Sequence, residues 1–423
     1  MIRSRAEEFR RGWPTLTAAA IGVGVGGTGL AIYSAGLFAA DLATEIGLGP
    51  AQYGASITLV AFGMGLAAPI VGHIVDRFGV KVPAIVGALC AAIGFVALAT
   101  VVHSVAAYMT TMAFIGFFGA GTGPIAFSRA VSSWFDRARG LALGITMMGS
   151  GLATAIIPIT IGRVVELEGW KFGYLTLACV AVAGVAPSLF FLNVAPRVER
   201  VSTLPGEPRA HEREFSAIRR DPLYWRLIFT FALMAVTVTG LVPYLIPMLR
   251  QGGVSISGAA AIASTLGVAV IVSRIAIGWL IDILRPTVVT AVLCLLCAGG
   301  VLLFAVGGIT FAPALALALG CLLGAELDLV GFFTSRYFGL AAYGKAFAGP
   351  YMAFVIGGGI APLCVGAIVS RTGSYTVVLY TVSALAALCA VAFLALPPVR
   401  KPTESSADVA STRTVPISVS AED

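Results

Sequence analysis

Long apolar runs alternate with short polar stretches along most of the chain. Each run is roughly 20 residues or longer, which is the length an α-helix needs to cross about 30 Å of hydrocarbon. We therefore predict an all-α membrane protein with twelve transmembrane helices. They lie near residues 14–40, 53–74, 82–102, 106–131, 139–163, 172–194, 224–249, 258–281, 287–309, 311–335, 345–370 and 375–397.

Three polar segments divide these runs. Residues 1–13 are basic, and Pro14 is expected to open the first helix, where its missing N–H costs nothing. Residues 195–223 are rich in Arg and Pro and are predicted to be a linker between two six-helix bundles, residues 14–194 and 224–397. Residues 398–423 are polar and are predicted to be a disordered tail.

The two halves share a spacing. Gly72 and Asp76 recur 206 residues later as Gly278 and Asp282. A second set recurs at an offset of 204, pairing Gly140 with Gly344, Pro158 with Pro362, and Gly162 with Gly366. Six helices return a chain to the same side of a membrane, so this pattern indicates an internal duplication in one orientation.

Composition supports membrane insertion. The 423 residues are 58% hydrophobic and only 11% charged, with a mean hydropathy of +0.97, whereas soluble domains carry about a quarter charged residues. The net charge of +7 comes from Lys and Arg on the side that holds both termini. We therefore predict a multi-pass protein of the cell inner membrane with cytoplasmic termini, in contact with lipid, monomeric and without a nucleic-acid partner.

Catalytic and metal-binding patterns do not assemble. All seven cysteines lie in apolar runs, and the Cys294–Cys297 pair has no second pair or histidine cluster beside it. Residues 24–29 satisfy G-x-G-x-x-G but follow no strand, so we expect a small-residue face for close helix contact rather than a nucleotide site. We expect no enzyme activity, no metal and no cofactor.

The stretch from Gly72 to Lys81 is predicted to be a short, tight turn at the membrane face, because its charges cannot lie in hydrocarbon. Gly72 would let two helix ends approach, and Gly79 would supply the backbone freedom of the reversal. Asp76, Arg77 and Lys81 would form pairs in one conformation and break them in another, although plain turn residues would have the same sequence. Asp282 would serve the same way in the second half.

The pattern Gly72-x-x-x-Asp76-Arg77-x-Gly79-x-Lys81 after the second of twelve runs resembles the loop signature of the major facilitator superfamily. The resemblance implies two six-helix bundles that rock about a central site and expose it alternately to each side. The stretch Trp134-Phe135-Asp136-Arg137-Ala138-Arg139-Gly140-Leu141-Ala142-Leu143-Gly144 is similar to the fifth-span motif of monocarboxylate porters and their oxalate–formate exchanger relatives. This second resemblance implies transport of a carboxylate.

The chain also departs from that group. The acidic, Gly-rich start of the first span in monocarboxylate porters is reduced to Gly12-Trp13 after Arg11. In their eighth span an Asp stands four residues before an Arg; here Arg274 follows Val270. The Lys of oxalate exchangers in the eleventh span has no match. Neither lactate nor oxalate is therefore implied as the substrate.

Arg274 is the main candidate for substrate binding. It lies about two turns from Asp282, so roughly 12 Å from that end of its helix. A charge at that depth is costly and is usually functional or paired. It would clamp a substrate carboxylate with its planar fork, or it would only hold the eighth helix to the tenth.

Glu326 and Asp328 lie in the tenth helix at a matching depth. Residues two apart point about 200° apart on a helix, so only one of them is expected to face a central cavity. That one would carry a proton or exchange Arg274 with the substrate; the alternative is a static buried pair. Sequence does not choose between the two acids.

Three further side chains are candidates. Tyr33 and Tyr244 lie at comparable places in the first helices of the two halves, and each would offer a hydroxyl to a carboxylate or only an amphipathic ring. Pro243 and Pro247 flank Tyr244, and broken helices often line transport sites. Arg129 would guide an anion or, as we prefer, contact Asp76.

These features favour a secondary transporter for a small organic anion, a mono- or dicarboxylate, by proton symport or anion exchange. The alternative is proton-driven efflux of amphipathic or cationic compounds, with Glu326 or Asp328 binding the cation. A membrane sensor on the same scaffold is less favoured, because such proteins tend to carry an extra folded domain.

Overall fold

The computed structural model describes residues 5–135, 138–193, 216–339 and 343–399. In these ranges the chain is helical and contains no β-strand. Within the described residues, eleven segments are long and apolar enough to cross a membrane. One of them, Pro286–Phe338, holds two helices, α14 and α15, joined by a 3₁₀ turn. The twelve predicted crossings are thus accounted for.

The first group of helices is α1 (Arg5–Gly24), α2 (Gly27–Ile46), α3 (Pro50–Phe78), α4 (Lys81–Thr100), α5 (Val105–Phe118), α6 (Pro124–Trp134), α7 (Arg139–Glu168), α8 (Trp170–Ala183) and α9 (Val185–Phe191). The second group is α11 (Pro222–Thr239), α12 (Leu245–Gln251), α13 (Ile256–Ile283), α14 (Pro286–Gly307), α15 (Ala312–Phe338), α16 (Tyr343–Thr372) and α17 (Thr376–Leu394). Of the predicted linker the structure describes residues 216–223, and of the predicted tail residues 398–399. Residues 216–220 are helical and α11 begins at Pro222, so the end of the predicted linker is helical rather than irregular.

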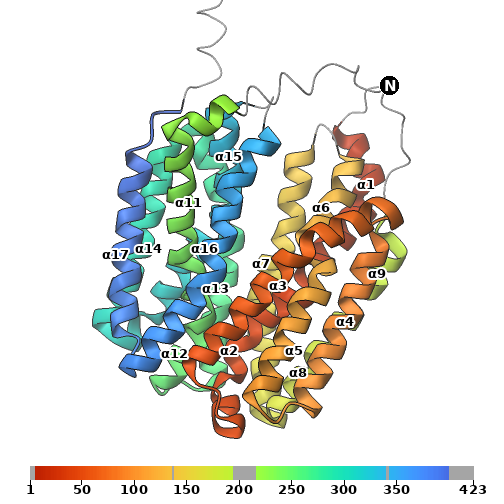
Figure 1. The fold of residues 1–423 in the computed structure, drawn as a ribbon, viewed down its shortest axis with the longest axis vertical. Helices are drawn as coiled ribbons and strands as arrows, with labels where there is room; N and C mark the ends of the chain where they lie inside the picture. The colour runs from red at the N-terminus through yellow and green to blue at the C-terminus, as the bar shows by residue number, and fades with distance from the viewer. Residues whose placement is uncertain (1–4, 136–137, 194–215, 340–342, 400–423) are drawn as a thin grey trace, which may run out of the picture.

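Figure 1 shows the two groups as two side-by-side bundles. We call the end where α1 begins and α17 ends the terminus end, and the opposite end the far end. The bundles meet through α3 against α16 and α7 against α13, and their ribbons diverge toward the terminus end (Figure 1). α13 also packs on α15 inside the second bundle, so α13 is shared between the bundle interior and the interface.

Several crossings are broken rather than continuous. The first one is not a single helix from Pro14: α1 starts at Arg5, holds Pro14 inside, and stops before Gly26. The backbone N–H of Gly27 then donates to the Thr122 hydroxyl at 3.0 Å, and a Cβ on Gly27 would overlap Ala91. The glycine-rich stretch therefore provides close helix contact, as expected, and also the break itself.

The predicted turn at Gly72–Lys81 is much shorter in the structure. α3 continues to Phe78, and only Gly79 and Val80 separate it from α4. Gly79 has φ of +81°, a conformation that favours glycine. A Cβ on Gly72 would meet nothing within 4 Å, so the expected close approach at Gly72 is wrong for this conformation. A helix can carry its last charged turn beyond hydrocarbon, which removes the need for a long loop.

The duplication reappears as two related contacts between the bundles. In one, Gly366 of α16 lies against Pro50 of α3, and Gly54 of α3 lies against Pro362 of α16. In the other, a Cβ on Gly162 of α7 would lie 2.9 Å from the Cβ of Ala260 of α13. Gly162 precedes Gly366 by 204 residues and Gly54 precedes Ala260 by 206. The repeated small residues are therefore among the places where the bundles touch closely.

Candidate functional site

Arg274 lies on α13 where that helix faces α15. Its side chain is only 9% exposed, and its Nη1 lies 3.7 Å from Oδ2 of Asp328. That separation is too long for a good hydrogen bond. Among the described residues, Nε and Nη1 of Arg274 have no hydrogen-bond partner. A buried guanidinium with unused donors is costly, so this site is suited to receive an anion.

Glu326 and Asp328 share α15 but not an environment. Glu326 is 3% exposed, and its Oε2 has no hydrogen-bond partner in the described chain. The side chain of Asp328 is 48% exposed. Arg274 acts electrostatically on both carboxyl groups. The structure therefore brings the three predicted residues together, with the two acids in different degrees of contact with solvent.

Tyr33 reaches this cluster from the other bundle. It lies on α2, half-buried, close enough to Arg274 and Glu326 to interact with both electrostatically. Thr154 of α7 lies beside Tyr33 at the edge of a small cavity, and its hydroxyl donates to the carbonyl of Ser150 at 2.8 Å. The site thus joins α2 and α7 of the first bundle to α13 and α15 of the second. A motion between the bundles would therefore change the distances between its residues.

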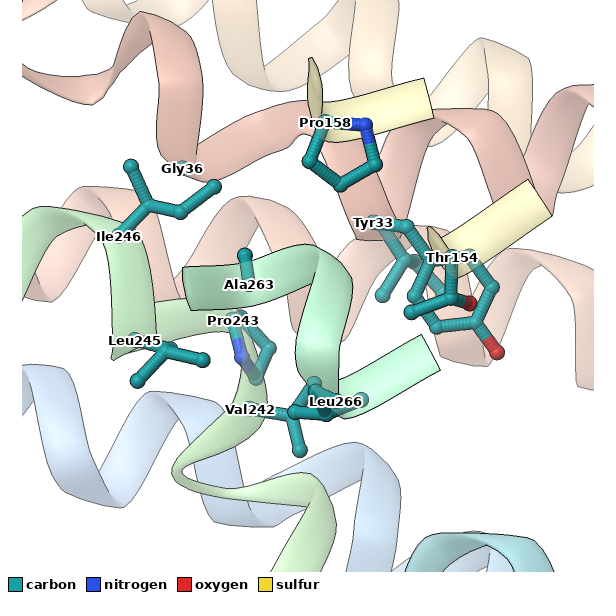
Figure 2. Close-up of a pocket in the computed structure, with 11 residues that line it drawn as sticks. Tyr33, Gly36, Thr154, Pro158, Val242, Pro243, Leu245, Ile246, Ala263 and Leu266 are labelled. Carbon is teal, nitrogen blue, oxygen red and sulfur yellow. The ribbon is translucent and has the colours of Figure 1, made fainter. Parts of the chain in front are cut away.

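A small cavity adjoins Tyr33 between the two bundles (Figure 2). Its volume is about 20 Å³, enough for about one water molecule. The hydroxyls of Tyr33 and Thr154 lie at one side of it, and apolar side chains of Pro158, Ile246 and Leu266 line other parts. In this conformation the far-end side of the site is therefore nearly filled.

Tyr244 has different surroundings from those expected of a substrate ligand. It is fully buried, and its hydroxyl lies 3.0 Å from the carbonyl oxygens of both Pro50 and Pro362. Its ring meets that of Tyr53 at 5.1 Å, edge to face, and the Tyr53 hydroxyl donates to the carbonyl of Pro243 at 2.7 Å. Tyr244 therefore pins α3 and α16 together at the far end, and its hydroxyl is already engaged.

Replacing Tyr244 with Phe is expected to weaken the far-end contact while leaving the ring packing in place. The lost hydrogen bond to the buried carbonyl of Pro362 costs about 1–3 kcal/mol. We expect the conformational equilibrium to shift toward a far-end-open state, measured as faster labelling of a cysteine introduced at Ala51. Unchanged labelling would contradict this role, and Tyr351→Phe of α16 is a matched control.

The predicted latch residues are only partly brought together. Arg129 of α6 and Asp76 of α3 form an ion pair at 2.7 Å, with both side chains more than half exposed. Lys81 donates to the carbonyl of Leu189 at 2.8 Å, and the Arg77 guanidinium lies 5.3 Å from the Phe78 ring centroid. Asp282 is the last residue but one of α13, and its side chain is outside what the structure describes.

Some contacts had little or no sequence signal. Glu8 is 4% exposed, and its carboxylate accepts a hydrogen bond from the backbone N–H of Ala138 at 3.1 Å, which caps the start of α7. Thr154 lies in an apolar run and looks like any helical Thr. For the contact made by Tyr53, the sequence offers one indication: Tyr53 precedes Gly54, whose counterpart in the second half is Ala260.

Comparison with known proteins gives a consistent result. The family model described as Major Facilitator Superfamily matches residues 19–335. The chain is 29% identical to "MFS-type transporter pynF" of Aspergillus niger over 44% of this chain and 41% of that protein. It is 29% identical to human "Monocarboxylate transporter 11" over 64% of this chain and 56% of that protein. The matched regions thus span about half the length of these relatives.

A solved structure shows the same fold. It is described as a bacterial homolog of the human lysosomal transporter Spinster, in an inward-facing and unoccupied conformation. The match has a TM-score of 0.63 and 16% identity and covers 93% of this chain and 96% of the other.

Proposed function

Because the chain belongs to the Major Facilitator Superfamily, we propose that it is a secondary transporter that carries a small organic anion, a mono- or dicarboxylate. The observation that carries this proposal is Arg274: a buried cation at the junction of the two bundles, with two guanidinium nitrogens lacking hydrogen bonds in the described chain. A carboxylate would accept from those donors and compensate the buried charge. The similarity to a protein named as a monocarboxylate transporter supports the same substrate class.

The substrate would bind between the bundles and be exposed to each side in turn. Tyr33 would contribute a hydroxyl to the bound carboxylate from α2, opposite Arg274 on α13. The terminus end would face the cytoplasm of a cell inner membrane, as the Lys and Arg distribution favours. Coupling would be by proton symport or by anion exchange.

Efflux of an amphipathic or cationic compound is the second candidate. The half-exposed carboxylate of Asp328 favours it, because that group could bind a cation without full desolvation. In that case Arg274 would serve as a structural partner of α15. The two candidates differ in which sign of ligand the site stabilises.

A thermal-shift experiment on the detergent-purified protein separates them. We expect one class of carboxylates to raise the melting temperature at pH 5.5 or 7.5, by an amount that grows with the logarithm of concentration over Kd. At a concentration 100 times Kd the gain would be about 2.7 kcal/mol. Shifts from amphipathic cations, with none from any carboxylate, would overturn the anion proposal.

A further inference from the structure

We propose that Glu326 and Asp328 have separate roles: Glu326 carries the coupled proton, and Asp328 occupies Arg274 until the substrate displaces it. This inference rests on the proposed function of anion transport and assigns its coupling residue. It follows from the different burial and contacts of two carboxyl groups that lie two positions apart on the same helix.

The position of Glu326 suits a proton carrier. It is 3% exposed, and Oε2 has no hydrogen-bond partner in the described ranges. An ionised carboxylate left in that state would pay a large desolvation cost, whereas a protonated carboxyl pays much less. The neutral form is therefore the stable one here while Arg274 is engaged by another anion.

The charged and titratable groups around Glu326 are few. Three described groups on neighbouring helices interact with Glu326 electrostatically. They are Arg274 of α13, Tyr33 of α2 and Cys297 of α14. Arg274 is the one cation in this set. Loss of the proton from Glu326 would therefore create an anion whose compensating charge is Arg274 itself.

Asp328 suits the opposite role. Its side chain is 48% exposed, so its carboxylate keeps much of its hydration when it leaves Arg274. Its distance of 3.7 Å from Nη1 shows a loose pair rather than a tight, bidentate one. A substrate carboxylate that reaches the unused guanidinium donors would replace it at small cost.

Charge balance then links the two roles. With the site empty and open to the side of uptake, Arg274 pairs with Asp328 and Glu326 holds a proton taken from that side; the empty site returns from the receiving side with Glu326 ionised against Arg274. When the substrate anion binds Arg274, Asp328 turns to solvent and Glu326 remains protonated, so one anion and one proton move together. Once Glu326 releases its proton to water on the receiving side, its carboxylate competes for Arg274 and the anion is expelled.

The test compares two isosteric variants reconstituted in vesicles, Glu326→Gln and Asp328→Asn. Glu326→Gln imitates the protonated carboxyl permanently. We expect it to lose uphill, proton-driven uptake of a carboxylate identified by the thermal-shift screen, while exchange of internal for external carboxylate continues. Its binding affinity should no longer change with pH. Continued exchange would show that the variant with Gln at this site is folded and still binds the carboxylate, so that only coupling to protons has been lost.

Asp328→Asn should behave differently. It removes the competing anion, so carboxylate affinity should rise by several-fold while proton-driven uptake persists. Glu168→Gln, an exposed residue at the far end of α7, is the matched control and should leave both readouts unchanged.

The outcomes distinguish this inference from the function it rests on. If the unmodified protein neither binds nor moves any carboxylate, the proposed function fails. If the unmodified protein does so but Glu326→Gln still drives uphill uptake, or if Asp328→Asn is the variant that loses coupling, the assignment of roles is overturned. If the unmodified protein exchanges carboxylates but shows no proton-driven uptake, the assignment is also overturned, because no proton would then need a carrier.

Discussion

Arg274→Ala should remove carboxylate binding and transport almost completely. Truncating one member of a buried charge pair typically costs about 2–5 kcal/mol, so affinity should fall about 30-fold or more. The cost is expected to be large because Arg274 is the one cation acting on Glu326 in the described chain, and its side chain is only 9% exposed. Binding is measured by ligand-dependent thermal shift, and transport by uptake into vesicles.

Two comparisons make this result specific. Arg274→Lys keeps the positive charge but loses the planar, two-toothed guanidinium. Its carboxylate affinity should therefore lie between that of Arg274→Ala and that of the unmodified protein. Arg129→Ala removes an exposed ion pair with Asp76, worth about 0–1 kcal/mol, and should leave carboxylate affinity unchanged. If Arg274→Ala kept full transport at normal expression, Arg274 would have only a structural role.

Gly54→Val should shift the protein away from the far-end-closed arrangement. A Cβ on Gly54 would overlap the carbonyl oxygen of Pro362 and the hydroxyl of Tyr244. Overpacking of this kind costs about 1–3 kcal/mol, and here the cost falls on one conformation only. The equilibrium between conformations should change about 5- to 150-fold, and transport should fall with it.

The measurement is the distance between spectroscopic probes at the far ends of α3 and α16, in a protein whose native cysteines have been replaced. We expect this distance to increase in Gly54→Val. Gly65→Val lies on the same helix, where an added Cβ meets nothing within 4 Å, and should leave the distance unchanged. If Gly54→Val lowered the thermal stability of the protein but left this distance unchanged, Gly54 would be needed for folding alone.

Much of the architecture could be predicted from sequence, because membrane thickness fixes helix length and the duplicated glycines recur at fixed offsets. The break at Gly26 was not predicted, since hydropathy stays high on both sides of it. The turn after α3 is also shorter than its charges predict, because charges mark where hydrocarbon ends, whereas a helix ends where its backbone geometry changes, here at Gly79.

The depth of Arg274, Glu326 and Asp328 was predictable from counting along helices, and the structure brings the three together. Their separate environments were not predictable, because the rotation of α15 about its axis depends on packing against α13 and α14. The partners of Tyr244 were equally hidden. They lie 194 and 118 residues away in the sequence, and backbone carbonyls leave no pattern in side-chain composition.

The two related contacts between the bundles are not equivalent, and this sets an order for the opening of the far end. The α3–α16 contact is tied by the Tyr244 hydroxyl and by the Ala51 N–H, which donates to the Ser370 hydroxyl at 2.9 Å. Gly162 of α7, in the sister contact, meets the methyl of Ala260 and the side chain of Leu37. Across α7 and α13 the Ser257 hydroxyl donates to the Glu166 carboxylate at 3.3 Å, between exposed side chains where water can replace the bond. The bond from Tyr244 to Pro362 is buried and must break, so α7 against α13 should act as the hinge and α3 against α16 as the side that swings apart.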